Sequence, residues 1–166
     1  MQSGTIICGF AGIGKTFLSS TYKNVIDLES SSYKWIYLDD VEDLNHEERK
    51  GLQNRVLNPA WPSNYVLDII GKCDKDNIVL TSMDKEVREA LRQWGCRYYV
   101  AYPDISCKDD YIERYKQRGN NEKFIETISS NFESWVQALE DETYKIVLRN
   151  GDFLETALIP LGILKK

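Results

Sequence analysis

Short apolar runs alternate along the chain with longer segments in which apolar residues recur every three or four positions. The short runs predict buried strands, and the periodic segments predict amphipathic helices. The predicted strands span residues 5–8, 25–28, 77–82, 97–102 and 144–148. The predicted helices span residues 17–22, 60 or 62 to 72, 85–94, 108–118, 121–139 and 152–159. This alternation predicts an α/β fold, a parallel sheet with helices on both faces and right-handed crossovers.

The segment after the first predicted strand matches the phosphate-binding pattern G-x-x-x-x-G-K-[ST]. It reads Gly9-Phe10-Ala11-Gly12-Ile13-Gly14-Lys15-Thr16 and leads into a predicted helix. Its glycines let the backbone curl around a phosphate, Lys15 can reach the β- and γ-phosphates, and the Thr16 hydroxyl can bind Mg²⁺. A chance glycine turn is the alternative, but strand, glycine loop, helix is the order that a phosphate loop requires. The predicted contacts to ATP are Gly9, Ala11, Gly12, Ile13, Gly14, Lys15, Thr16 and Phe17.

Two carboxylates, Asp27 and Glu29, follow the second predicted strand. Ligands of parallel sheets bind at the carboxyl ends of the strands, so we expect both carboxylates to face the glycine loop and to bind the acceptor. Asp27 can also act in catalysis, by orienting a Mg²⁺-bound water or accepting the proton of an attacking hydroxyl. Capping of the next segment is the alternative. Thr16 and Asp27 are the predicted metal ligands, but the supporting carboxylate stays open among Asp27, Asp84 and Asp39.

Residues 29–61 form a long connection between a strand and a helix. Segments of this length are usually functional or disordered. The aromatic residues here, and a short helix predicted over residues 47–56, favour an insert that covers a substrate. Trp61, in an aromatic turn with two prolines, is a candidate for stacking on a nucleobase in the substrate site, although core packing is the commoner fate of such residues.

Two arginines, Arg114 and Arg118, stand four residues apart and share one face of a predicted helix that ends at a Gly-Asn tip. Such a pair suits a lid, over residues 104–123, that closes on phosphates and offsets charge in phosphoryl transfer. A solvated helix face with carboxylate partners is the alternative. Arg88, after the third strand, is a weaker candidate for holding a substrate phosphate, and an ordinary exposed arginine is its alternative.

The chain has 166 residues, which fits a single domain over residues 1–166. Its net charge of −5 argues against broad binding to nucleic acid. The four cysteines form no C-x-x-C pair, which favours free thiols in a reducing cytosol. The first strand begins almost at once and no apolar run reaches membrane-spanning length, so we expect a cytoplasmic protein without a signal peptide. A monomer or a homodimer is expected.

The glycine loop, the Asp-Leu-Glu after the second strand and the arginine-containing segment 113–120 together resemble the P-loop nucleoside/nucleotide kinase family. Within it, the chain looks like small phage and bacterial adenylate kinase-like proteins. The resemblance implies a three-layer α/β/α fold with a five-stranded parallel sheet in the order 2-3-1-4-5, a substrate-binding insert after strand two and a short lid after strand four. Typical adenylate kinases carry aspartate-glycine-phenylalanine-proline-arginine after the third strand, and this chain departs from them with Thr81-Ser82-Met83-Asp84-Lys85.

The resemblance also implies roles for individual residues. Lys15 and Thr16 correspond to the residues that bind the ATP phosphates and Mg²⁺, Arg114 and Arg118 to the lid arginines, and Arg88 to an arginine that contacts the substrate phosphate. We therefore expect an ATP-dependent phosphotransferase that uses Mg-ATP, with a small nucleotide such as a nucleoside monophosphate as acceptor. A switch protein that hydrolyses ATP or GTP without an acceptor is the main alternative, and a subunit of a DNA-repair or defence ATPase is a third.

Overall fold

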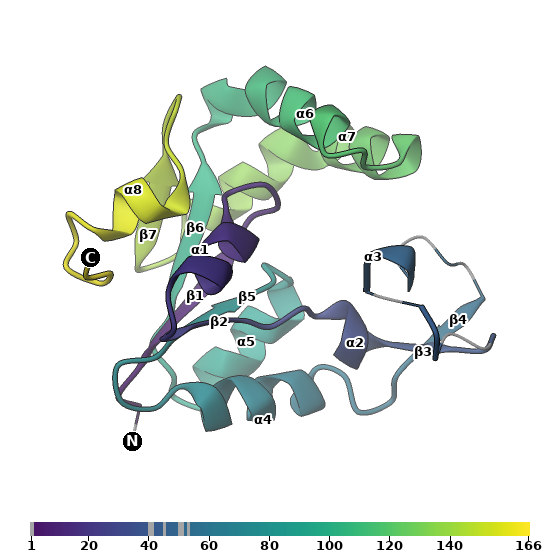
Figure 1. Cartoon of the computed structure of the whole chain (residues 1–166), viewed down its shortest axis with the longest axis horizontal. Coiled ribbons are helices and arrows are strands. Elements are labelled where there is room, and N and C mark those ends of the chain that lie inside the picture. Colours follow the sequence, from purple (N-terminus) through teal and green to yellow (C-terminus); the bar gives the residue numbers. More distant parts are fainter. Residues whose placement is uncertain (1, 40–41, 45, 50–51, 53) are drawn as a thin grey trace.

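The computed structural model describes residues 2–39, 42–44, 46–49, 52 and 54–166. All five predicted strands are present in it, each within two residues of its expected ends. They are β1 (Thr5–Gly9), β2 (Val25–Asp27), β5 (Ile78–Thr81), β6 (Tyr99–Pro103) and β7 (Lys145–Leu148). They form a parallel sheet in the order β2-β5-β1-β6-β7 (Figure 1). Counting only these five strands, the order is 2-3-1-4-5, which confirms the predicted fold.

The centre of the sheet is apolar because helices cover both of its faces. Strand β5 is buried along its whole length, and β1 is buried from Ile6 to Gly9. Cys8 pairs with Thr81 of β5 and with Val100 of β6, so the phosphate loop leaves the middle of the sheet at its carboxyl edge. Fully buried strands of this kind are typical of parallel sheets in α/β proteins.

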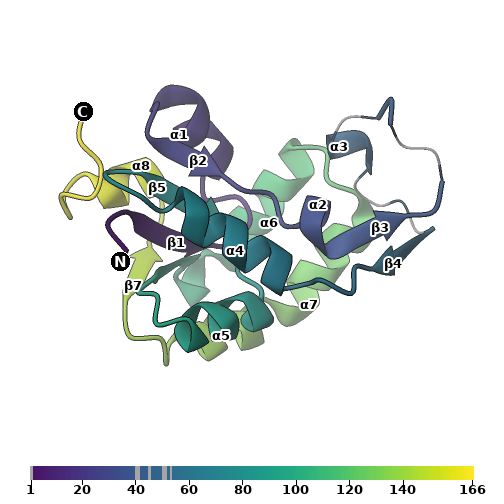
Figure 2. The ribbon, with the colours of Figure 1, turned by 90° about the horizontal axis from the view of Figure 1, so that it is seen from below.

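The predicted helices are also present. A right-handed crossover places α1 (Lys15–Thr21) on one face of the sheet, where it contacts α8 (Leu154–Leu158), the helix after β7. The other face carries α4 (Ser63–Lys72), α5 (Lys85–Gln93) and α7 (Glu122–Leu139) (Figure 2). After β6, a short turn, η1 (Ile105–Cys107), leads into α6 (Lys108–Gln117), which packs against α7.

The insert after β2 has more structure than the sequence predicted. It contains α2 (Ser31–Lys34), β3 (Trp35–Tyr37), α3 (His46–Arg49) and β4 (Arg55–Leu57). Strands β3 and β4 pair antiparallel and form a second sheet that projects beyond the main one (Figure 1). The predicted helix over residues 47–56 is therefore wrong at its end, where residues 55 and 56 belong to β4. Residues 50, 51 and 53 of that prediction lie outside the described part of the chain.

Cross-strand packing explains why this segment forms a hairpin. The guanidinium of Arg55 lies 4.0 Å from the centre of the Trp35 ring, and both residues lie on the same face of the hairpin. Such a pair is worth about 0.5–1 kcal/mol at an exposed site.

Among the helices of the described residues, none is long and apolar enough to span a membrane.

Candidate active site

The glycine loop between β1 and α1 has the backbone shape that its sequence predicts. Gly12 and Gly14 have φ angles of +84° and +99°, a left-handed conformation that residues with a Cβ rarely adopt. Gly14 directly precedes the first residue of α1, Lys15. The loop therefore curls tightly and ends at the first turn of a helix, whose N–H groups have no partners within the helix.

Three successive carbonyl oxygens of the loop accept hydrogen bonds from outside it. The Tyr115 hydroxyl donates to the Ala11 oxygen at 2.8 Å, and an Arg114 nitrogen donates to the Gly12 oxygen at 3.2 Å. The backbone N–H of Leu154 donates to the Ile13 oxygen at 2.9 Å. Helices α6 and α8 therefore hold the loop by its carbonyl groups. Among the N–H groups of the loop, that of Phe10 donates to the Ala101 oxygen at 2.9 Å.

The side chain of Lys15 lies inside the curl of the loop and donates a hydrogen bond to the Gly9 oxygen at 2.9 Å. Burial lowers the pKa of Lys15, and the carboxylates of Asp27 and Glu29 act in the opposite direction. The positive charge of Arg118 lowers the pKa of Lys15 slightly further. The structure thus brings four of the predicted site residues close enough for their charges to interact.

Asp27 is the last residue of β2, and Glu29 follows two positions later, at the same carboxyl edge as the phosphate loop. Asp84 lies after β5, accepts a hydrogen bond from the Ser82 hydroxyl at 2.9 Å and pairs with Lys34 at 3.5 Å. Asp39 accepts a hydrogen bond from Asn54 in the projecting insert. Of the three carboxylates that the sequence left open, Asp27 is the one whose charge acts on Lys15.

A magnesium ion needs few protein ligands beside a nucleotide, because it is usually held by one or two side chains, water and substrate phosphates. Within the described ranges, no group of three or more His, Cys, Asp or Glu side chains is placed to hold a metal. Thr16 is exposed in the first turn of α1, and Asp27 ends β2 with its charge acting on Lys15, so the two residues offer a hydroxyl and a carboxylate. This donor set fits a Mg²⁺ ion that is bound mainly by phosphates.

Arg114 has a different position from the one expected of a mobile lid arginine. Its side chain is only 16% exposed, and besides Gly12 it pairs with Asp110 at 3.3 Å. Its guanidinium carbon lies 4.4 Å from the ring centres of both Tyr111 and Phe153. Arg114 is thus held between two aromatic rings against the wall of the phosphate loop. Its predicted catalytic role stays a prediction.

Arg118 lies one turn further along, at the carboxyl end of α6, and is exposed. It precedes Gly119, which has a φ of +77° and open space around its Cα. Gly119 ends α6 in a C-cap, in which the N–H groups of Gly119 and Asn120 donate to the oxygens of Lys116 and Tyr115 at 3.0 and 3.1 Å. Arg118 is therefore an exposed arginine at the end of the helix, and its charge acts on Lys15.

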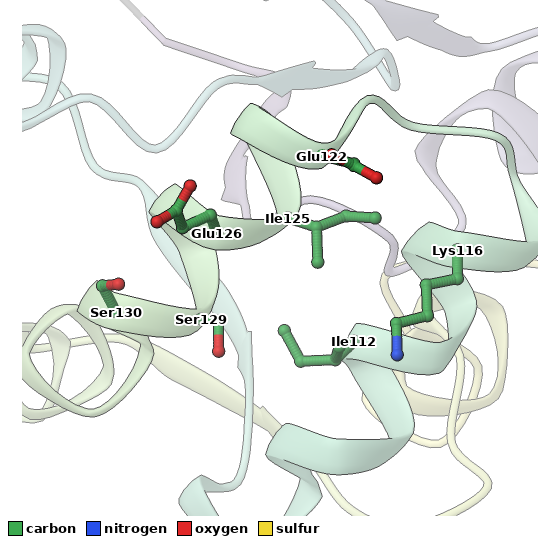
Figure 3. A pocket seen from close by; sticks show the side chains of 7 residues that line it. All are labelled: Ile112, Lys116, Glu122, Ile125, Glu126, Ser129 and Ser130. Carbon is green, nitrogen blue, oxygen red and sulfur yellow. The ribbon is translucent and has the colours of Figure 1, made fainter.

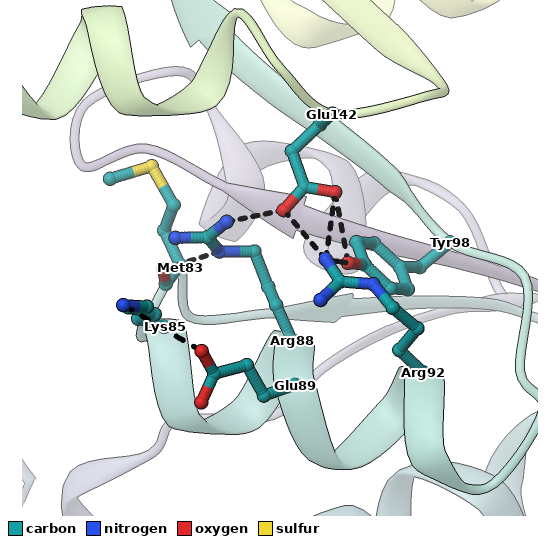
Figure 4. A network of polar contacts seen from close by, with 7 residues as sticks. All are labelled: Met83, Lys85, Arg88, Glu89, Arg92, Tyr98 and Glu142. Carbon is teal, nitrogen blue, oxygen red and sulfur yellow. Dashed lines mark hydrogen bonds and ion pairs between the residues drawn. The ribbon is translucent and has the colours of Figure 1, made fainter.

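Arg88 lies in an ion-pair network between α5 and the segment that precedes β7 (Figure 4). It pairs with Glu142 and donates a hydrogen bond to the Met83 oxygen at 3.2 Å. The side chains of Arg88 and Glu142 are 11% and 10% exposed. Arg92 and Tyr98 contact the same carboxylate, and burial together with the neighbouring Glu142 raises the pKa of Tyr98 to about 12. Arg88 therefore has a partner within the fold, and a substrate phosphate would have to compete with it.

Trp61 packs within the protein, the alternative that the sequence left open. Its ring stacks on Tyr65 at 5.4 Å, and Lys34 lies 5.3 Å from its centre. Its indole N–H donates to Glu86 at 3.1 Å. These contacts, and the ion pair of Lys34 with Glu86, fix the base of the insert to α4 and α5.

Phe17, a predicted contact to ATP, is 56% exposed on α1.

A surface hollow lies elsewhere, where α6 and α7 meet (Figure 3). Ile112 and Lys116 of α6 face Ile125 and Glu126 of α7 across it. Ile112, Lys116 and Glu122 belong to the predicted lid segment, but none of the lining residues is one of the predicted site residues.

Sequence reasoning missed several residues that shape the site. Tyr115 and Leu154 hold the loop carbonyls, Phe153 covers Arg114, and Glu142 engages Arg88. The spacing of Tyr115 and Arg114 on one helix was visible in the sequence, but nothing there placed that helix against the loop.

Comparison with protein-family models finds no match, and comparison with curated proteins finds none. Among solved structures, the chain is similar to a gluconokinase from Sinorhizobium meliloti 1021, with 16% sequence identity and a TM-score of 0.48. The likeness covers 98% of this chain and 91% of that one. Likeness at this level carries no assignment of activity. The P-loop kinase-like fold follows from the strand order and the glycine loop themselves.

Proposed function

We propose that this chain is a phosphotransferase that uses Mg-ATP. The observation that carries the proposal is Lys15, which donates a hydrogen bond to the glycine loop and lies close enough to the carboxylates of Asp27 and Glu29 for their charges to act on it. A cation and backbone N–H groups at the carboxyl edge of a parallel sheet suit phosphate, and a carboxylate beside them suits the acceptor of a phosphoryl group.

Each residue has a part in this proposal. Bound Mg-ATP would supply the phosphoryl group and, through the ion, neutralise part of its charge. Lys15 holds the β- and γ-phosphates, and Thr16 and Asp27 support the ion. Asp27 also orients the acceptor hydroxyl and takes its proton. Arg118, exposed at the end of α6, offsets charge on the transferring group.

The acceptor in this proposal is a small nucleotide such as a nucleoside monophosphate. Its support is the sequence resemblance and the position of the insert, whose base lies next to the carboxyl ends of β2 and β5. We propose that the chain is one domain, in which residues 29–61 cover the acceptor and residues 104–123 form the lid segment.

A nucleotide switch that hydrolyses ATP or GTP without an acceptor is the second candidate. One observation favours it: Arg88 and Trp61, both predicted to bind the acceptor, have partners within the protein. A switch binds no acceptor, so these internal contacts of Arg88 and Trp61 would not interfere with its activity.

A screen of acceptors separates the two candidates. Wild-type protein with ATP and Mg²⁺ is offered each nucleoside monophosphate and nucleoside in turn, and ADP release is compared with the rate without acceptor. The kinase proposal expects at least one acceptor to raise the rate about tenfold or more and to appear as a phosphorylated product. Equal rates with every acceptor would favour the switch.

A further inference from the structure

Helix α6 meets the phosphate loop through two adjacent residues, Tyr115 and Arg114. From these contacts we infer that Tyr115, with Arg114, is a positioning residue that presets the N–H groups of the phosphate loop before a nucleotide binds. The inference rests on the proposed function, because it assumes that the loop binds the phosphates of ATP. Tyr115 would act through the loop backbone without touching the nucleotide.

The planarity of the peptide bond supplies the physical reason. In a trans peptide the C=O and the following N–H point in opposite directions from one rigid plane. The Tyr115 hydroxyl, 2.8 Å from the Ala11 oxygen, therefore turns the N–H of Gly12 away from α6. In the same way, Arg114 at the Gly12 oxygen directs the N–H of Ile13 away from its own guanidinium.

Helix α8 fixes a third peptide of the loop in the same way. The N–H of Leu154 donates to the Ile13 oxygen and thereby directs the N–H of Gly14 away from α8. Successive N–H groups that converge from a loop form an anion-binding concavity. Because the N–H groups are already oriented, phosphate binding loses less conformational entropy of the loop, and the binding free energy is more favourable by the same amount.

The packing of Tyr115 shows that this contact is built into the core. Its side chain is fully buried, and its ring packs edge to face on Tyr111 and Phe124 at 6.3 and 5.4 Å. A Cβ added to Gly12 would lie 2.9 Å from a ring carbon of Tyr115. The ring and the bare Gly12 backbone thus interlock, and α6 cannot shift along the loop without disturbing it.

One consequence concerns the lid. If α6 and the phosphate loop form one unit through Tyr115 and Arg114, closure over a nucleotide has to come from residues beyond that contact. Arg118 and Gly119, at the C-cap of α6, are the first such positions.

The test compares the Tyr115→Phe variant, which loses only the hydroxyl, with a matched control. Tyr98→Phe removes the hydroxyl of another buried tyrosine, which donates to Glu142 at 2.9 Å. Tyr98 directly precedes Tyr99, which pairs with Ile7 of β1, two residues before the loop begins at Gly9. Affinities for Mg-ATP and for Mg-pyrophosphate are measured by calorimetry, well below the melting temperature of each variant. Arg114→Met is measured alongside in case Tyr115→Phe does not fold.

We expect Tyr115→Phe and Arg114→Met each to raise the Kd for ATP about fivefold or more, with a similar factor for pyrophosphate, because the defect lies at the phosphates. The Kd of Tyr98→Phe should stay within about twofold of wild type, even though its melting temperature falls. A substitution at a residue that only stabilises the fold would lower the melting temperature and leave both affinities unchanged, so wild-type affinities in the folded loop variants would overturn the inference.

If wild-type protein binds neither probe, the proposed function fails and the inference fails with it. If wild type binds and the loop variants bind equally well, the inference alone fails.

Discussion

Replacing Arg88 with methionine tests whether this arginine belongs to the fold or to the acceptor site. Methionine keeps much of the length and volume of the side chain but removes its charge and its hydrogen bonds. The carboxylate of Glu142 would then remain in a position where it is only 10% exposed. It would keep two partners, the Tyr98 hydroxyl at 2.9 Å and Arg92 at 3.3 Å.

The size of the effect follows from this burial. Removing one partner of a buried ion pair typically costs about 3–5 kcal/mol. Because two partners of Glu142 remain, we expect Arg88→Met to lie at or below the low end, at about 2–3 kcal/mol. Arg92 contacts the same carboxylate but is 60% exposed, so Arg92→Met should cost no more than about 1 kcal/mol.

Urea unfolding measures both variants against wild type. With a slope of about 2 kcal/mol per molar urea, the Arg88 variant should unfold about 1–1.5 M earlier and the Arg92 variant less than about 0.5 M earlier. Adding Glu142→Gln to Arg88→Met should recover part of the loss, since it removes the unpaired charge. If Arg88→Met unfolds at the wild-type urea concentration but raises the KM for an acceptor, the arginine serves the acceptor site and our reasoning about the network is wrong.

Three further predictions concern the site itself. Gly12→Ala should cost about 2–4 kcal/mol in stability by urea unfolding and abolish ATP binding, because the alanine would have a φ of +84° and its Cβ would lie 2.9 Å from the buried ring of Tyr115. Gly119→Ala, with a φ of +77° but open space, should cost only about 1–2 kcal/mol, and equal costs for the two variants would refute the interlocking of Gly12 with Tyr115. Because the pKa of Lys15 is lowered in the folded state, ATP affinity should fall as the pH rises through that pKa, below the pH at which an ordinary lysine loses its proton. Between the folded and the unfolded pKa the unfolded state binds more protons, so the free energy of unfolding should rise with pH there. A Lys15→Arg variant whose calorimetric pH profile matches that of wild type would contradict this prediction. Asp27→Asn should lower acceptor-dependent turnover by about a hundredfold or more but Mg-ATP affinity by only about tenfold or less, because the phosphates hold most of the Mg²⁺ coordination. Asp84→Asn, whose carboxylate pairs with Lys34, should change turnover by less than about tenfold, and equal effects of the two variants in a steady-state assay would contradict the assignment of Asp27.

The sheet could be predicted from the sequence because its strands are short apolar runs separated by periodic helices, and this local signal survives without tertiary contacts. The insert could not. Strands β3 and β4 have three residues each, and the charged residues between them have helical spacing as well. The pairing of Trp35 with Leu57 that defines the hairpin is a contact between distant residues, which periodicity does not report.

The candidate site divides in the same way. The phosphate loop is contiguous in the chain, so its motif was readable and its glycines have the backbone angles that the motif requires. The partner of Arg88 lies 54 residues away, at Glu142, and the group that holds the Ala11 oxygen lies 104 residues away, at Tyr115. Residues separated by such distances reveal their roles only when the fold brings them together. The arginine with a predicted role in the acceptor site has a partner in the fold, and a tyrosine with no predicted role holds the phosphate loop.

The most direct test of the account is the affinity of wild type and Lys15→Ala for Mg-ATP, measured by calorimetry on folded protein. Lys15 is the cation inside the loop, and the loss of a charge-assisted contact to phosphate is worth about 1.5–3 kcal/mol. The account predicts that wild type binds Mg-ATP and that Lys15→Ala binds at least about tenfold more weakly at an unchanged secondary-structure content. Equal affinities, or no binding by wild type, would contradict it.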